Sequence, residues 1–226
     1  IYEVDFFDYS YGFRPKKNAH QALKAIGDSV NGKPVNHIVE ADIKGFFDNV
    51  EHDLLVDFLR IRIKDSSLLF LIERFLKAGY VDDNHLVITE KGTPQGSILS
   101  PMLANIFLHY VLDKWFDEVV TNHVRGYVEL VRYADDFICL VQSKNDADRI
   151  LKALQNRFAK YQLQLHPEKT SVFSFGRYER QNARKEGRKA NTFDFLGFTH
   201  YCDVARKGHF KVGRKTSAKK YRAKAK

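Results

Sequence analysis

The sequence predicts an α+β fold with a βαββαβ core, and two kinds of segment carry that prediction. Three segments rich in β-branched and aromatic residues have the character of strands, the middle one being long enough for a hairpin: 35–43, 127–142 and 171–175. Apolar residues recur at helical spacing in the segments between them: 51–63, 66–78, 100–120 and 146–161. This order of elements is that of the ferredoxin-like core, which places the first strand beside the hairpin.

Two helices of the first half have recognisable starts and ends. Asn18 is placed to cap a helix that reaches about Val30, ahead of the first strand. Ser66 or Ser67 is expected to cap the helix that ends near Ala78, where a glycine follows. Together with the irregular, aromatic-rich opening of the chain, these helices are expected to stand outside the βαββαβ core.

The remaining segments are assigned from turn residues and breakers. A hairpin is expected over 80–91, followed by a glycine-containing loop. Ser100 and Pro101 then supply the cap and first turn of the long helix. After the last core strand, a polar basic stretch at 176–191 separates the core from a second hairpin at 192–202.

Positive charge is concentrated at the end of the chain. The net charge is +9, but residues 176–226 contain sixteen Lys or Arg and four Asp or Glu, a net of +12, so residues 1–175 carry a net of −3. No acidic residue follows Val204, and Phe210 and Tyr221 lie among the basic residues, which favours a polyanion over a plain solvated surface. We expect this tail to be poorly ordered alone. Its expected nucleic-acid contacts are Arg206, Lys207, Lys211, Arg214, Lys215, Lys219 and Lys220.

The composition argues against a membrane or secreted protein. No apolar run approaches the roughly 20 residues of a membrane span, and no secretory signal opens the chain. Cys139 and Cys202 lack the spacing of a metal site, so we expect reduced structural thiols and a cytoplasmic location. Because the chain starts at Ile1, it is expected to be a piece of a longer product.

Three aspartates are the candidate catalytic residues. Asp135 and Asp136 lie between the apolar arms of the hairpin, where adjacent carboxylates repel unless a cation holds them. A turn with two solvated carboxylates is the plain alternative, although such turns more often use Asn-Gly or Asp-Gly. Asp42 ends the first strand, which the topology places beside the hairpin. Three converging oxygen ligands suit Mg²⁺ bound with substrate phosphates, and two such ions form the clamp of in-line phosphoryl transfer.

Five motifs stand in a recognisable order: Tyr11-Gly12-Phe13-Arg14-Pro15, Ala41-Asp42-Ile43-Lys44-Gly45-Phe46-Phe47-Asp48, Gly92-Thr93-Pro94-Gln95-Gly96-Ser97, Tyr133-Ala134-Asp135-Asp136 and Phe193-Asp194-Phe195-Leu196-Gly197-Phe198-Thr199-His200. In order and spacing they resemble the reverse transcriptases encoded by bacterial group II introns. The resemblance runs from the first residues to beyond residue 200. It implies a reverse-transcriptase palm, built on the βαββαβ core, with partial helical fingers.

The resemblance also implies a two-metal polymerase site. Asp42 and Asp135 would bridge two Mg²⁺ ions, with Mn²⁺ as an alternative. Ile43 would lend its backbone carbonyl to the metals, and Asp136 would be a more peripheral ligand. Lys169 matches a lysine near the pyrophosphate, where it would protonate the leaving group.

Further residues match positions that contact the nucleotide in this family. Phe47 would lie under the sugar and clash with a 2′-hydroxyl, while Phe46 is the better core residue. Gln95 and Gly96 would face the incoming nucleotide and the template. Arg14 has two interpretations of equal weight, a contact to a template or nucleotide phosphate and a structural ion pair.

The resemblance further divides the chain into regions. They are partial fingers and connecting elements at 1–34 and 52–92, palm at 35–51 and 93–175, a primer-grip region at 176–203, and the basic tail at 204–226 leading toward a thumb. Within the third region, Phe195, Leu196 and Gly197 resemble the primer grip, a hairpin that holds the primer end near the metals.

The predicted function is that of an RNA-directed DNA polymerase core. Its expected partners are an RNA template, a DNA primer and deoxynucleoside triphosphates, with structured intron RNA as a further partner and no membrane. One alternative is an RNA-binding splicing cofactor, a maturase. Another is a related polymerase of phage defence or CRISPR adaptation. The intact Asp42, Asp135 and Asp136 argue against a purely binding role.

Overall fold

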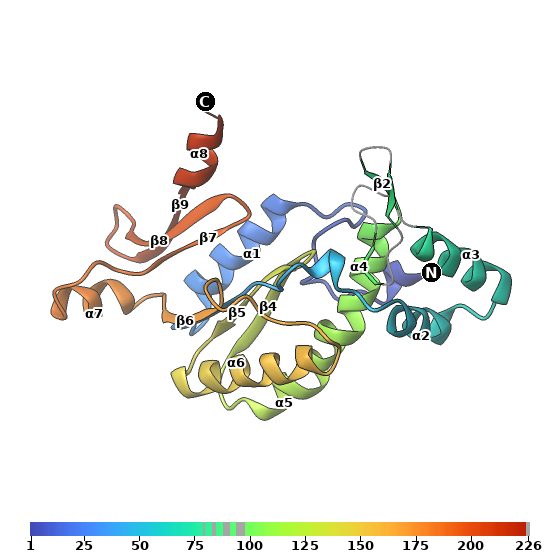
Figure 1. The fold of residues 1–226 in the computed structure, drawn as a ribbon. Coiled ribbons are helices and arrows are strands. Elements are labelled where there is room, and N and C mark those ends of the chain that lie inside the picture. Colours follow the sequence, from blue (N-terminus) through green and yellow to red (C-terminus); the bar gives the residue numbers. More distant parts are fainter. Residues whose placement is uncertain (79, 83–84, 88–90, 94–97, 225–226) are drawn as a thin grey trace.

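The centre of the molecule is a four-stranded antiparallel sheet. The computed structural model describes residues 1–78, 80–82, 85–87, 91–93 and 98–224. In the order β4-β5-β1-β6, the sheet contains β4 (Val128–Tyr133), β5 (Asp136–Val141), β1 (His37–Ala41) and β6 (Ser171–Ser174). β1 lies between β5 and β6, so the first strand does adjoin the hairpin (Figure 1). The predicted α+β class and this adjacency are confirmed.

Two helices pack against strands, α1 (Ala19–Gly32) and α6 (Lys144–Ala159), whereas α2 (His52–Arg62) and α3 (Ser66–Lys77) pack against each other beside α4 (Ser100–Leu108). The α1 helix starts with a capping box, in which Asn18 and Gln21 each accept the other's backbone N–H. The predicted cap of α3 was wrong. Asp65, not Ser66 or Ser67, accepts the free N–H groups of the first turn, because its carboxylate also faces the positive end of the helix dipole.

The predicted helix from Ser100 is present, but it is not α-helical throughout. It runs through α4 (Ser100–Leu108), a π-helical turn η3 (His109–Asp113), a second π-helical turn η4 (Phe116–Val120) and α5 (Thr121–His123). Ser100 is already helical rather than the cap, and Pro101 lies in the first turn. Arg157 of α6 donates to the Tyr110 and Val111 carbonyls of the first π-helical turn. We refer to residues 100–123 as the long helix.

A second antiparallel sheet follows the core, in the order β7 (Thr192–Phe195), β8 (Phe198–Val204) and β9 (Phe210–Thr216). It corrects the expectation of a poorly ordered tail, because β9 and α8 (Ala218–Lys224) occupy most of that segment. The physical reason is that apolar and basic residues alternate along β9. Phe210 and Val212 pack against the core, and the basic residues between and after them are exposed. The polar stretch at 176–191 likewise contains a helix, α7 (Glu179–Lys185).

Several smaller features complete the chain. Strands β2 (Tyr80–Asp82) and β3 (His85–Val87) pair within the predicted 80–91 hairpin, whose turn lies outside the described residues. Single 3₁₀ turns occur at η1 (Tyr2–Val4) and η2 (Phe46–Asp48). None of the described helices combines the length and apolarity needed to cross a membrane. Cys139 and Cys202 are free thiols in the interior.

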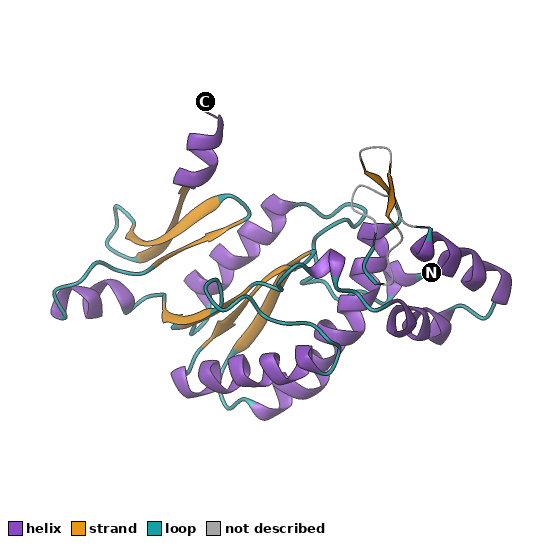
Figure 2. Ribbon diagram, viewed as in Figure 1, coloured by secondary structure: helices purple, strands orange, loops and turns teal. Residues whose placement is uncertain are grey.

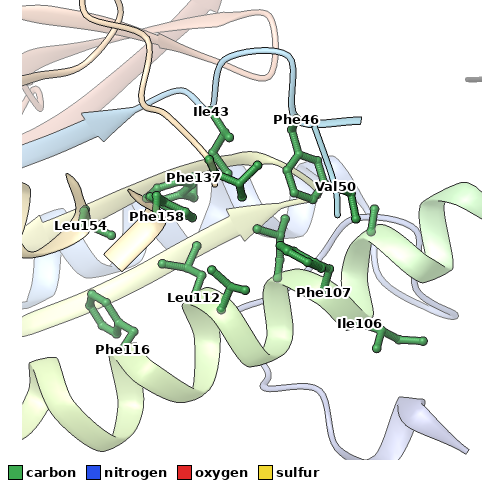
Figure 3. Packing of buried hydrophobic residues seen from close by; sticks show 14 of the residues in the cluster. Ile43, Phe46, Val50, Ile106, Phe107, Leu112, Phe116, Phe137, Leu154 and Phe158 are labelled. Carbon is green, nitrogen blue, oxygen red and sulfur yellow. The ribbon is translucent and has the colours of Figure 1, made fainter. Parts of the chain in front are cut away.

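The central sheet is buried on both faces (Figure 2). One face packs against α6 and the long helix through residues such as Phe137, Phe107 and Leu112 (Figure 3). The other face packs against α1 and the second sheet through a separate cluster that includes Ile38 and Ile138. Neighbouring strand residues therefore point to opposite layers, and this parity decides where the functional side chains lie.

Candidate active site

Strand pairing brings the three candidate aspartates to one end of the central sheet. The last residue of β1 pairs with Phe137 of β5, and Asp42 is the next residue of the chain. The two-residue turn between β4 and β5 consists of Ala134 and Asp135, and Asp136 begins β5. The sheet therefore places a carboxylate at the end of one strand beside two carboxylates at the neighbouring turn.

A cavity of about 350 Å³ opens beside these residues, between β1, β5 and the β7–β8 turn. Its lining includes five of the predicted site residues: Asp42, Asp136, Lys169, Phe195 and Leu196. It also includes three carboxylates that sequence reasoning missed: Glu40, Glu168 and Asp194. Asp135 is outside this lining, on the turn. The available signal for Glu40 was its strand parity, because it shares a face with Asp42 two residues later.

The carboxylates of the cavity perturb one another. Burial, with added repulsion from Asp194, Asp42 and Asp136, raises the pKa of Glu40 to about 7. Desolvation by the surrounding protein and repulsion from Asp135 and Asp42 raise the pKa of Asp136 to about 6, although part of its side chain is exposed. Burial and repulsion from Asp42 also raise the pKa of Asp135. The cavity therefore favours a bound cation or a proton, because either one neutralises negative charge.

Lys169 supplies positive charge at this site. Its Nζ donates to Oδ2 of Asp42 at 3.0 Å, and both side chains remain in contact with solvent. The loop that carries Lys169 is fixed by backbone bonds, one of them from the His166 amide to the Asp42 carbonyl at 2.7 Å. This loop also pairs Leu165 with Ile43. The backbone hydrogen bonds of that bridge involve the Asp42 carbonyl and the Lys44 amide. The carbonyl of Ile43, the predicted metal ligand, takes no part in them.

The carboxylates are not arranged as a preformed metal centre. Among the described residues, no three His, Cys, Asp or Glu side chains already stand in metal-binding geometry. The donor chemistry nevertheless fits a hard divalent cation. The groups are carboxylate oxygens at the ends of rigid strands, and their mutual repulsion is relieved by a positive ion.

Phe47 lies next to the loop that begins the Gly92–Ser97 motif. Its side chain is half-buried, while the neighbouring Phe46 is buried in the core as predicted (Figure 3). Thr93 N–H donates to the Phe47 carbonyl at 2.7 Å, and Gly92 has a left-handed backbone. A Cβ at Gly92 would come within 2.8 Å of the Phe47 carbonyl oxygen. Gln95 and Gly96, farther along this motif, lie outside the described residues.

The predicted primer-grip residues lie at the β7–β8 turn, where Phe195 ends β7 and Leu196 and Gly197 form the turn itself. Leu196 and Gly197 both have positive φ values, 50° and 78°, as a two-residue hairpin turn with right-handed twist requires. Phe195 is buried against the second core cluster, which holds the turn close to the cavity. The Ser217 amide donates to the Gly197 carbonyl and ties the turn to the end of β9.

Arg14 forms an ion pair with Glu3, as one of its two predicted interpretations expects. Its side chain is only 5% exposed, and its Nη2 lies 2.8 Å from the Glu3 carboxylate. Further guanidinium donors bond to the carbonyl groups of Phe7 and Ser10. This arrangement favours the structural interpretation over a phosphate contact, because the donors of Arg14 already hold the N-terminal segment together.

The basic residues of the expected tail lie on a folded surface. Arg206, Lys207, Lys211, Arg214 and Lys215 are all exposed, and Lys219 and Lys220 belong to α8. A groove of about 690 Å³ between α7 and the β8–β9 turn is lined by Lys211 together with Arg177, Arg180 and His209. Asp203 also lines it and lies 3.4 Å from Lys211. The groove presents more positive than negative charge to solvent.

Comparisons with known proteins agree with these observations. Residues 2–200 match the family model described as reverse transcriptase (RNA-dependent DNA polymerase). The group II intron-encoded protein LtrA of Lactococcus lactis subsp. cremoris is 50% identical over 115 residues, 51% of this chain and 19% of LtrA. Protein YkfC of Escherichia coli (strain K12) is 31% identical over 170 residues, 63% of this chain and 45% of YkfC. The chain thus spans less than half of these relatives.

Solved structures show the same fold at much lower identity. A telomerase from Candida albicans, in complex with a TWJ fragment of telomeric RNA, superimposes with a TM-score of 0.68 at 14% identity. The match covers 95% of this chain and 36% of that one. The predicted resemblance to group II intron-encoded proteins is confirmed by LtrA, and the predicted reverse-transcriptase fold by the telomerase. The chain belongs to the reverse transcriptase (RNA-dependent DNA polymerase) family.

Proposed function

We propose that this chain is the catalytic region of an RNA-directed DNA polymerase of the group II intron type, acting in the cytoplasm. The observation that carries the proposal is the convergence of Asp42, Asp135 and Asp136 at one end of the sheet, beside Lys169. Family membership supplies the reaction class. The partners that follow are an RNA template, a DNA primer and deoxynucleoside triphosphates, with structured intron RNA as a further ligand.

In this reaction the primer 3′-oxygen bonds to the α-phosphorus of the nucleotide, and the bond to pyrophosphate breaks. Two divalent ions, Mg²⁺ or Mn²⁺, held by Asp42, Asp135, Asp136 and the Ile43 carbonyl, would lower the pKa of the 3′-hydroxyl and neutralise the triphosphate. Lys169 pairs with Asp42 in an exposed contact that is readily exchanged. Once released, its ammonium group is available to donate a proton to the leaving pyrophosphate.

The surrounding residues fit the substrates of such a polymerase. Phe47 keeps an exposed part next to the anchored Gly92–Thr93 segment, which supports its role in excluding a ribose 2′-hydroxyl. The turn of Phe195, Leu196 and Gly197 borders the cavity, where it would support the primer end. In this assignment the central sheet is the palm, and the helix pair α2–α3 belongs to the fingers.

A second candidate function is splicing-cofactor activity through RNA binding. The observation that favours it is the groove with Arg177, Arg180 and Lys211, because clustered guanidinium and ammonium groups bind RNA phosphates. The groove adjoins the end of β6 and the end of α1, whereas the aspartates lie at the other end of the central sheet. The two activities are therefore compatible within one molecule.

Replacing Asp135 with Asn tests the polymerase proposal. A neutral amide removes a metal ligand yet relieves repulsion, so primer extension on an RNA template should fall by at least about a thousandfold while thermal stability is kept. Asp28→Asn, at an exposed pair on α1, is the control and should extend normally. Retained extension in Asp135→Asn would refute the assignment. Loss of activity that merely follows loss of folding would also count against it.

A further inference from the structure

Arg132 is a fully buried arginine beside the candidate site. It lies on β4, one residue before the end of the strand, and its side chain is 0% exposed, as is that of Asp113 in the long helix. Its Nε and Nη2 donate to the two Asp113 carboxylate oxygens at 2.8 and 2.5 Å. A buried charge is costly unless it is paired and fully hydrogen-bonded. The remaining guanidinium nitrogen of Arg132, Nη1, must therefore also have a hydrogen-bond acceptor.

That remaining donor reaches the catalytic turn. Nη1 of Arg132 donates to the carbonyl of Ala134 at 2.9 Å, and also to Oδ1 of Asn105 at 2.9 Å. Ala134 is the turn residue directly before Asp135, and its φ of 57° lies in the left-handed region. The backbone of a residue other than glycine is strained in this region, and it keeps that conformation only when the surrounding structure enforces it. The guanidinium thus ties the turn to the long helix.

The N-terminal segment braces the same turn from another side. Asn105 donates its side-chain amide to the Gly12 carbonyl at 2.7 Å. Gly12 lies against the turn so closely that a Cβ would come within 2.3 Å of the Ala134 nitrogen. The segment is also bound along β4, because the Arg132 amide donates to Tyr9 and the Tyr11 amide donates to Arg132. This accounts for a glycine in the Tyr11–Pro15 motif.

A third feature places Asp113 opposite Arg132. The first π-helical turn of the long helix ends at Asp113. A π-helical turn adds a residue to the helical repeat, so it changes which side chains face inward, and such turns recur at functional sites. The carbonyls of Tyr110 and Val111 in this turn are bonded by Arg157 rather than left to solvent. The local departure from α-helix is therefore supported by its surroundings.

We propose that Arg132 is a positioning residue for Asp135, acting through the Ala134 carbonyl, with Asp113, Asn105 and Gly12 completing the brace. The proposal rests on the proposed catalytic role of Asp135. Metal ligands must be held within about half an ångström of their working positions, and a turn with a strained residue does not hold itself. The brace fixes the turn before any metal or nucleotide is bound.

The test uses the full chain with two variants that disturb the turn in different ways. Arg132→Lys keeps the charge opposite Asp113 but loses the planar fork needed for all four bonds. Gly12→Ala leaves every charge in place and pushes on the Ala134 backbone. Arg188→Lys is the matched control, because Arg188 also pairs with a buried carboxylate, that of Glu179 on α7, but lies outside the turn and its brace. Amide hydrogen exchange of residues 133–137 is measured without metal, and Mn²⁺ affinity by electron paramagnetic resonance.

Both brace variants should exchange about tenfold faster in the 133–137 peptide, because the turn opens locally. Their Mn²⁺ affinity should fall by at least about tenfold, the usual effect of removing a group that orients a metal ligand. The control should lose thermal stability while both readouts stay within about twofold of wild type. If Arg132→Lys does not fold, Gly12→Ala decides.

Two results separate this inference from the function on which it rests. Exchange and Mn²⁺ affinity that match the control in both brace variants would overturn the positioning role. Asp135→Asn that keeps wild-type Mn²⁺ affinity and extension would instead overturn the proposed catalytic site, even if the turn exchanged faster.

Discussion

Replacing Glu40 with Gln should stabilise the metal-free protein at pH 8 and leave its stability at pH 4 almost unchanged. Glu40 lies in the middle of the sheet, paired with Ile138 on β5 and Ser171 on β6. Burial and the neighbouring carboxylates raise its pKa from 4.5 to about 7. The unfolded chain therefore ionises Glu40 more readily than the folded protein does, and folding becomes less favourable as the pH rises through this window.

The magnitude follows from the size of that displacement. A change in pKa from 4.5 to about 7 corresponds to at most roughly 3–4 kcal/mol of destabilisation above pH 7. Solvent and salt screen the repulsion from the other carboxylates of the open cavity, so we expect a gain of about 1–2 kcal/mol on neutralisation. For a chain of this size that raises the melting temperature by roughly 2–8 °C.

Thermal and urea unfolding in chelator at pH 8 and pH 4 measure this effect. Glu129→Gln is the control, because Glu129 belongs to the same sheet, bonds Tyr127 and lies outside the cavity. Saturating Mg²⁺ should shrink the gain of Glu40→Gln, since the ion relieves the same repulsion. No gain at pH 8, or an equal gain at pH 4, would refute the reasoning, because it would mean that neither burial nor the neighbouring carboxylates raise the pKa of Glu40.

Two other predictions concern substrates. Phe47→Val should raise the ratio of ribonucleotide to deoxynucleotide incorporation, measured by single-nucleotide extension, and an unchanged ratio in an active variant would move the sugar gate elsewhere. Replacing Lys211 and Lys215 with Gln should weaken RNA binding and flatten the slope of log affinity against log salt by roughly 0.7–0.9 for each RNA phosphate that is no longer neutralised. Equal effects from the control substitutions of Lys24 and Lys64, exposed lysines of α1 and the α2–α3 turn, would mean that β9 is an ordinary charged surface.

The centre of this fold was predictable because it depends on local pattern. The apolar runs that became β1, β4, β5 and β6 are short and separated by turn residues, so their order fixed the topology. That topology alone predicted that Asp42 lies near Asp135. The tail was not predictable from charge, because the residues that fold it, Phe210 and Val212, are sparse and alternate with lysine and arginine. The high charge of the tail predicted disorder, whereas the alternation of apolar and basic residues would have predicted a strand.

The support of the site was out of reach for a different reason. Arg132 and Asp113 are nineteen positions apart and come from a strand and a helix, and no spacing rule links them. The one available sign was an arginine flanked by Leu130, Val131 and a turn, since a charge carried into a packed sheet must find a partner. Glu40 gave a similar sign on β1. Buried or half-buried charge on a strand marks a position where function outweighs packing.

The two faces of the sheet consequently have different relations to stability. On the face toward the long helix, Val39 and Phe137 contribute only burial, and truncating them should destabilise the protein. On the opposite face the carboxylates of Glu40 and Asp136 are held at raised pKa values, so neutralising either one should stabilise the metal-free protein. Measuring stability and extension together therefore separates two kinds of carboxylate. Neutralising a carboxylate that binds the metal should abolish primer extension. Neutralising a carboxylate that only adds negative charge to the cavity should raise stability and leave primer extension intact at saturating metal.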